Sequence, residues 1–436
     1  MFKPKTSPLL NPLAKTLFSL LIIFSSSQLG KHFWPQFSLV NGLRVDYLSP
    51  TLYVSDILIF LLIGWALINH GLSFPPRNIK RVIKWLLIIS GLGVLLAWPS
   101  RSPLAYGYGL IKVAEWWGLF WAGKQIILKN THKFWLFTSL LLILSLLSLS
   151  QFYLQKSLGG VAYFWGEREF TKLTPGIAQT IWQGQLLLRP YATFSHPNSL
   201  AGFLLVGWWL GWESLGKRLG KKQGKDRRGI WLIVTLLVMI TLGLTWSRMA
   251  WLVIMVEICL WLGQIHLKPK LWPSLALGIT ILAVFFPFIL GNFEAAILSP
   301  SWQESIGLRQ KLFFAAWQLF GSQPLWGVGL KNFISHLVDF QLGLSRAWLQ
   351  PVHSIYWLIL AETGLLGFGL WLGLVLTITR WLTKSKNWWL FFAWVAILLT
   401  GMNDHYWLTL QQNQLLMVLL LIFTEQAAHP QWQKRK

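Results

Sequence analysis

The sequence predicts an all-α polytopic membrane protein. Of its 436 residues, 54% are hydrophobic and only 12% are charged, and the mean hydropathy is +0.52. Tryptophan, a side chain that favours the boundary between water and lipid, occurs 30 times. The single cysteine, Cys259, excludes an intrachain disulfide and a thiolate metal cluster. We therefore expect one membrane domain over residues 1–436 and no soluble domain.

Apolar runs of spanning length divide the chain into about 12 transmembrane helices, since one crossing needs about 20 residues. The predicted spans are 13–28, 51–69, 82–98, 104–124, 134–153, 198–213, 229–245, 248–266, 271–291, 353–379, 388–403 and 408–424. The apolar stretch from Ile230 to Leu262 exceeds one crossing. It therefore requires a tight turn between Thr245 and Arg248.

The distribution of basic residues predicts the orientation. Of the 38 lysines and arginines, 25 fall in the termini and the connections on one side, and 12 fall in the connections on the other. Basic residues collect on the cytoplasmic side, so both termini are predicted to be cytoplasmic. The net charge of +24 then reflects topology rather than nucleic-acid binding. The first apolar segment also resembles a signal peptide, but without a clear cleavage site we expect an uncleaved span.

Two connections on the outer side are long, at residues 154–197 and 292–352. Long loops in compact membrane proteins are usually functional. The second contains a predicted amphipathic helix near 306–320. Its apolar face is predicted to hold Leu308, Leu312, Phe313, Ala316 and Phe320. Such a helix would lie in the outer interface or cap a cavity.

Ionisable residues at membrane depth are costly and each one needs an explanation. Lys112 and Glu115 lie three positions apart on one predicted helix, so they are expected to neutralise each other. Glu257 has no partner nearby in the sequence. It is either a hydrogen-bonded structural acid or part of a transport pathway.

Three arginines lie in separate outer connections: Arg189, Arg248 and Arg309. A guanidinium offers a fixed fork of donors that matches phosphate oxygens, so together they would form a diphosphate clamp. The alternative is that each extends to lipid headgroups.

His353 begins a predicted span on the outer side, with Ser354 next to it and Glu362 further along the same helix. A histidine there is either a polar helix cap or a general base for a hydroxyl. Asp339 and Asp404 are further candidate bases. His196 lies near Arg189 in the other outer loop. This arrangement does not predict a metal site.

These residues resemble the O-antigen ligases and the related O-antigen polymerases of the Wzy type. The family pattern of His, Asn or Ser, nine residues, Gly, two residues and Gly is met by His353, Ser354, Gly364 and Gly367. The ligase pattern Arg-x-x-x-Leu is met by Arg248 and Leu252. The segments 189–202 and 324–333 also read like the family, so the resemblance covers about residues 185–370.

The resemblance implies a GT-C-like membrane glycosyltransferase at the outer face of the cytoplasmic membrane. Its donor would be a polyprenyl (undecaprenyl) diphosphate-linked glycan, and its acceptor a hydroxyl on lipid A-core, another glycan or a protein. It would need no metal, nucleotide sugar or other cofactor, and it would invert the anomeric configuration. His353 would activate the acceptor, Arg248 would hold the diphosphate with help from Arg189 and Arg309, and Ser354, Glu362 and His196 would support them.

Other functions remain open at this stage. An O-antigen polymerase would use the same donor with a different acceptor. A secondary transporter with 12 spans, including one for bicarbonate uptake, would explain Glu115, Glu257 and Glu362. A peptidoglycan polymerase and a non-catalytic assembly protein fit less well. The polar residues concentrate at the outer boundary, and the pattern from His353 to Gly367 is that of another family.

Overall fold

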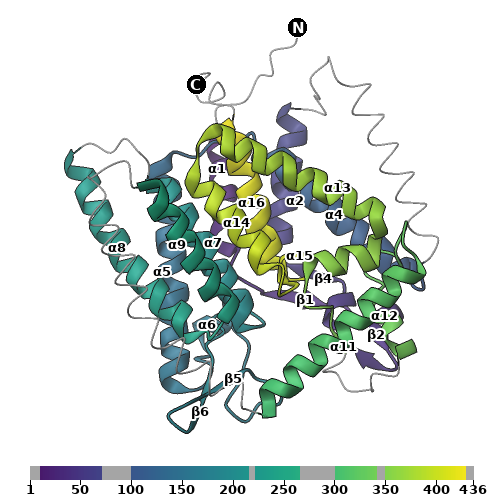
Figure 1. Ribbon diagram of the computed structural model, residues 1–436. Helices are drawn as coiled ribbons and strands as arrows, with labels where there is room; N and C mark the ends of the chain where they lie inside the picture. The colour runs from purple at the N-terminus through teal and green to yellow at the C-terminus, as the bar shows by residue number, and fades with distance from the viewer. Residues whose placement is uncertain (1–9, 71–99, 216–220, 266–299, 341–348, 429–436) are drawn as a thin grey trace.

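The computed structural model describes residues 10–70, 100–215, 221–265, 300–340 and 349–428, and within these it is mostly helical (Figure 1). The helices longer than one turn are α1 (Leu10–Phe24), α2 (Val54–His70), α4 (Pro103–Gly123), α5 (Asn130–Leu154), α7 (Pro197–Leu215), α8 (Lys221–Leu244), α9 (Arg248–Ile265), α11 (Pro300–Ser322), α13 (Ile355–Ser385), α14 (Trp388–Thr400) and α16 (Gln411–Ala428). Single turns form α6 (Val161–Phe164), α12 (Phe333–His336) and α15 (Tyr406–Thr409).

Most of the predicted spans overlap a helix, and the predicted spans 82–98 and 271–291 lie outside the described residues. Three described helices are long and apolar enough to cross a membrane, over Asn130–Leu154, Asp226–Leu244 and Ile355–Ser385. Shorter apolar helices cover Pro12–Phe24, Val54–Asn69 and Trp388–Thr400. The chain is therefore a membrane protein, while the total of 12 spans and the cytoplasmic termini remain predictions.

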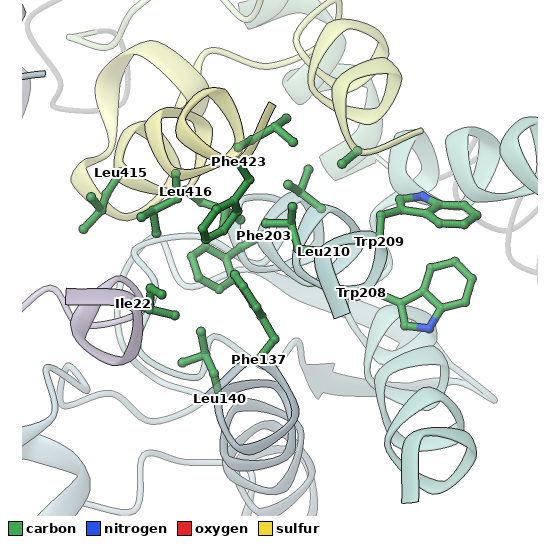
Figure 2. Close-up of a cluster of buried hydrophobic side chains, with 14 of the residues drawn as sticks. Ile22, Phe137, Leu140, Phe203, Trp208, Trp209, Leu210, Leu415, Leu416 and Phe423 are labelled. Carbon is green, nitrogen blue, oxygen red and sulfur yellow. The ribbon is translucent and has the colours of Figure 1, made fainter. Parts of the chain in front are cut away.

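Helix α7 forms the centre of the bundle, where it packs against α5, α8, α14 and α16. Figure 2 shows Phe203 and Leu210 of this helix among side chains of the neighbouring helices, including Phe137 and Phe423. All four are buried. Gly211 allows the closest approach, because a Cβ there would lie 1.9 Å from the Trp231 ring. Burial on every side explains why α7 lacks a polar face.

The peripheral helices expose apolar side chains on their outer faces. On α8, Leu232, Ile233 and Leu236 are exposed, and on α13 Leu370 and Leu376 are exposed. In a soluble protein such continuous apolar surfaces would be unfavourable, whereas lipid tails cover them without cost. The exposure pattern therefore follows from a membrane environment.

Helix α13 is broken at Gly364, whose φ of 60° and ψ of −164° are not helical. The segment after α11 fills the break: Leu365 donates its backbone N–H to the Pro324 carbonyl at 2.8 Å, and the Gly329 N–H donates to the Glu362 carbonyl at 2.9 Å. A Cβ on Gly364 would lie 2.4 Å from the Leu325 backbone. The predicted span 353–379 overlaps this helix, which is long and apolar enough to cross a membrane. The helix begins at Ile355 and changes direction at Gly364, because the inserted segment replaces helical hydrogen bonds.

Short antiparallel ribbons cover the bundle. In the first connection, β1 (Gly30–His32) pairs with β4 (Thr51–Tyr53), and β2 (Leu39–Val40) pairs with β3 (Leu43–Arg44). In the outer loop 154–197, β5 (Gln179–Trp182) and β6 (Gln185–Leu188) form a hairpin. Gln183 and Gly184 have positive φ values of 49° and 75°, which fit a two-residue hairpin turn. The sequence analysis did not predict these ribbons.

The predicted amphipathic helix exists as α11 and packs against α13. Leu312 and Ala316 are buried, and Leu308 and Phe320 are partly buried, as the periodicity predicts. Phe313 differs from the prediction, since 43% of it is exposed while its ring lies edge-on against Trp357 at 4.8 Å. The packed face is therefore rotated away from Phe313.

Candidate active site

Arg189 follows β6 and is held by the start of α7 and the end of α8. Its Nε donates to the Thr245 carbonyl at 2.6 Å, and its Nη2 donates to Asn198 Oδ1 at 2.8 Å. Thr245 lies in the tight turn between α8 and α9, which the sequence predicts, and Trp246 in that turn has a φ of 48°. The Arg189 guanidinium is therefore held between the turn after α8 and the start of α7.

Asn198 connects this arginine to a carboxylate in the connection between α14 and α15. Its Nδ2 donates to Asp404 Oδ2 at 3.1 Å. The other oxygen of Asp404 accepts the backbone N–H of His405 at 2.8 Å. Burial alone would raise the pKa of Asp404, but the neighbouring His405, His353, His196 and Arg309 lower it to about 2. Asp404 is thus a carboxylate at neutral pH.

His353 lies in the turn before α13, facing the same carboxylate. Its ring centroid is 5.4 Å from that of His405, and its Nδ1 is buried with no hydrogen-bond partner among the described residues. Burial lowers the pKa of His353 to about 3, although Asp404 raises it. The imidazole is therefore neutral at pH 7, and a neutral imidazole has one nitrogen able to accept a proton.

Arg248 and Arg309 complete the cationic side of the site. Arg248 is the first residue of α9, and Arg309 on α11 donates to Asn403 Oδ1 at 3.4 Å. Burial and the positive charge of Arg309 lower the pKa of Arg248 to about 10. Burial also lowers the pKa of Arg189 to about 10, as do the charges of Arg248 and Arg309, while Tyr191 opposes them. The three arginines thus affect one another electrostatically.

His196 and Ser354 lie at the edges of this cluster. His196 is exposed, and its Nδ1 accepts the backbone N–H of Asn198 at 3.1 Å. Ser354 is the buried N-cap residue of α13, and its backbone carbonyl accepts from the N–H of Leu358 at 3.0 Å. Ser354 thus stabilises the start of the helix that follows His353.

Glu362 lies in a different cluster, on the far side of the first segment of α13. Its carboxylate accepts from the Tyr47 hydroxyl at 3.1 Å and from the Phe333 N–H at 3.2 Å. Lys331 joins this cluster by donating to the Tyr47 carbonyl at 2.8 Å. Asp339 also lies elsewhere, paired with Arg101 at 2.7 Å. Neither acid is placed to assist His353.

Three ionisable groups within the helices have structural partners. Lys112 pairs with Glu115 at 2.6 Å, as the spacing predicts, and also with Asp56 on α2 at 3.2 Å. Glu257 is fully buried and accepts from Trp209 Nε1 at 2.7 Å. These contacts tie helices together, which favours the structural explanation for each group.

Composition and spacing predicted no role for His405, Asn403 or Asn198. The only signal was local: Asn403, Asp404 and His405 form a polar run between two apolar helices. Polar residues at such a connection are ordinary, so the run alone does not indicate a site.

What the arrangement can do chemically follows from its charges. Arg189, Arg248 and Arg309 influence one another electrostatically, and Arg309 also acts on the neutral imidazole of His353 and the carboxylate of Asp404. Such a set can bind a polyanion and accept a proton from a neighbouring hydroxyl.

Residues 231–372 match the O-antigen ligase family model. This part of the chain is therefore similar to the O-antigen ligases. The O-antigen ligase segment includes Arg248, Arg309 and His353, while Arg189 and Asp404 lie on either side of it. No curated protein matches the chain.

Proposed function

We propose that this O-antigen ligase family protein transfers an oligosaccharide from a polyprenyl diphosphate donor to an acceptor hydroxyl. The observation that carries the proposal is the electrostatic coupling of Arg189, Arg248 and Arg309, together with His353, which interacts with Arg309 and whose Nδ1 has no hydrogen-bond partner among the described residues. The site would face the outer side of the cytoplasmic membrane, and the acceptor would be lipid A-core, another glycan or a protein.

The chemistry needs two functions from the protein. When the acceptor oxygen bonds to the anomeric carbon, the bond from that carbon to the diphosphate oxygen breaks and negative charge builds on the leaving group. The arginines would stabilise this charge. Such electrostatic stabilisation is usually the largest single contribution to catalysis. His353 would take the proton from the acceptor hydroxyl. A single displacement inverts the anomeric configuration.

Asp404 would stabilise the imidazolium that forms on His353. The positive charge of that imidazolium appears only during the reaction, and Asp404 already raises the proton affinity of His353 in the free protein. Asn198 would keep the carboxylate in place through its 3.1 Å hydrogen bond. Both residues are therefore positioning residues for this step.

A polymerase of the same family is the second candidate, since it would use the same donor and differ only in its acceptor. A transporter is less well supported, because Lys112, Glu115 and Glu257 hold helices together. We retain solute uptake as the alternative outcome of the experiment below.

The test is release of free polyprenyl diphosphate by the purified protein in lipid nanodiscs. The reaction contains a lipid-linked oligosaccharide, a crude acceptor extract and EDTA. We expect release that needs the acceptor and is lost by about 100-fold or more in His353→Ala. His336→Ala is the matched control, because His336 lies in α12 and binds the Asn332 carbonyl. Undiminished release by His353→Ala, or solute uptake without release by the wild type, would contradict the proposal.

A further inference from the structure

A pocket of about 380 Å³ lies between α1 and the connection from α4 to α5, at the other end of the molecule from the arginine cluster. Its polar wall contains Lys15, Lys129 and His132, and its apolar wall contains Leu20, Ile23 and Leu128. The pocket therefore joins a basic rim to an apolar wall.

The position of the pocket relative to the membrane follows from the length of α5. His132 lies in the first turn of this helix, while Gln151 near its end donates to the Ala192 carbonyl in the loop that carries Arg189. The helix between these two residues is about 28 Å long. This length is close to the thickness of a hydrocarbon core, about 30 Å. The pocket therefore lies at the opposite membrane boundary, which the charge distribution predicts to be cytoplasmic.

The two lysines of the pocket have no carboxylate partner among the described residues. Both are exposed. By contrast, the neighbouring Lys133 is buried and pairs with Glu213 at 3.3 Å. The positive charge at the rim is thus not neutralised by the protein, and it is available to an anionic headgroup.

Ser19 fixes the polar wall. Its hydroxyl donates to the Lys15 carbonyl at 2.6 Å, and its oxygen lies 2.8 Å from His132 Nε2. A serine hydroxyl has one hydrogen, so His132 must donate from Nε2 to Ser19. The contact connects α1 to α5 and holds the pocket open at its basic end.

We propose that this pocket binds an anionic phospholipid of the inner leaflet. The headgroup phosphate would lie between Lys15 and Lys129, and one acyl chain would cover Leu20, Ile23 and Leu128. Charge complementarity selects the anionic headgroup, and the apolar wall selects a lipid over a soluble phosphate. The site is about one bilayer thickness away from the proposed transferase site, so the proposal does not depend on that function.

Native mass spectrometry of the delipidated full-length protein in detergent tests the proposal. The probes are palmitoyl-oleoyl phosphatidylglycerol, the zwitterionic phosphatidylcholine with the same chains, and inorganic phosphate. We expect one phosphatidylglycerol to bind preferentially. The double variant Lys15→Gln and Lys129→Gln should weaken this binding on the order of 30-fold, since each surface lysine contributes about fivefold.

The matched control removes two lysines with the same change of charge at the end of α13. Lys384 and Lys386 are exposed and lie in another basic connection, predicted to be on the same side. The double variant Lys384→Gln and Lys386→Gln should bind phosphatidylglycerol as the wild type does. A further variant, Leu20→Trp, keeps both lysines and obstructs the apolar wall at a residue that is 37% exposed. Leu20→Trp should also lose the binding of phosphatidylglycerol.

Three results would overturn the proposal. Equal binding of phosphatidylcholine and phosphatidylglycerol would show that charge does not select the ligand. Undiminished binding by the Lys15 and Lys129 double variant would place the lipid elsewhere. Binding of inorganic phosphate that equals the binding of phosphatidylglycerol and is insensitive to Leu20→Trp would indicate a simple anion site.

Discussion

Asn198 donates a hydrogen bond of 3.1 Å to the carboxylate of Asp404, across 206 positions of the chain. The same side chain accepts a hydrogen bond of 2.8 Å from Arg189. One neutral amide therefore separates a guanidinium from a carboxylate that would otherwise pair. This separation keeps the arginine available to a substrate anion.

Replacing this amide by a carboxylate tests that role. Asn198→Asp would place a negative charge against Arg189, so the guanidinium would pair within the protein instead of with the donor. We expect the KM for the donor to rise about tenfold or more, with a smaller change in kcat. Asn387→Asp is the control, because Asn387 is the N-cap of α14 and aspartate caps helices equally well. An unchanged KM in Asn198→Asp would show that Arg189 does not contact the donor.

Arg248→Lys tests whether the geometry of the guanidinium matters in addition to its charge. Lysine keeps the positive charge and loses the planar fork of donors. We expect kcat/KM for the donor to fall by about 10-fold to 100-fold, the contribution of one charged hydrogen bond. The exposed Arg228 on α8 gives the control, Arg228→Lys, which should be neutral. Full activity of Arg248→Lys would instead indicate that this residue anchors the protein to lipid headgroups.

The pH dependence of stability reports on His353. Its pKa is lowered from 6.5 to about 3, so the unfolded chain binds this proton more readily than the folded protein does. The contribution of His353 to the free energy of unfolding is complete above pH 6.5 and is lost as the pH falls towards 3. We expect the Tm of the wild type to fall more steeply below pH 6.5 than that of His353→Gln. Parallel curves for the two proteins would contradict the lowered pKa.

Gly364 and Gly369 provide a matched pair within α13. Gly364 has a positive φ, and a Cβ there would meet the Leu325 backbone at 2.4 Å, whereas a Cβ on Gly369 meets nothing within 4 Å. Gly364→Ala should destabilise the protein by at least about 1–3 kcal/mol. Gly369→Ala should stabilise it by about 0.5–1 kcal/mol. Thermal unfolding in detergent measures both, and equal Tm values would show that the break in α13 is absent.

Glu362→Gln separates a structural role from a catalytic one. The variant removes the charge that lies near Lys331 and weakens the hydrogen bonds from Tyr47 and Phe333. We expect a loss of about 1–3 kcal/mol of stability. Activity at a temperature where the variant is folded should fall far less than in His353→Ala. Glu169→Gln, at an exposed residue, is the control for the change of charge. A loss of kcat equal to that of His353→Ala would return Glu362 to the active site.

The sequence by itself determined the elements that depend on local composition. The apolar runs that fall within the described residues overlap helices, and the polar turn at Thr245 separates α8 from α9. The spacing of Lys112 and Glu115 gave their ion pair. The motif around His353 gave the resemblance to the O-antigen ligases, whose family model matches residues 231–372. Each of these features arises within about one helix, where periodicity and spacing are sufficient.

The tertiary structure decided which distant residues meet. Arg189, Asn198 and Asp404 come from three connections, and no local pattern couples them. Gly364 looked like a helical residue, yet its conformation is set by the segment after α11 that inserts there. Glu362 was expected to support His353 from further along the same helix, whereas the structure places its carboxylate beside Tyr47 and Lys331. Such contacts depend on how helices pack against one another, and helix periodicity does not specify which faces meet.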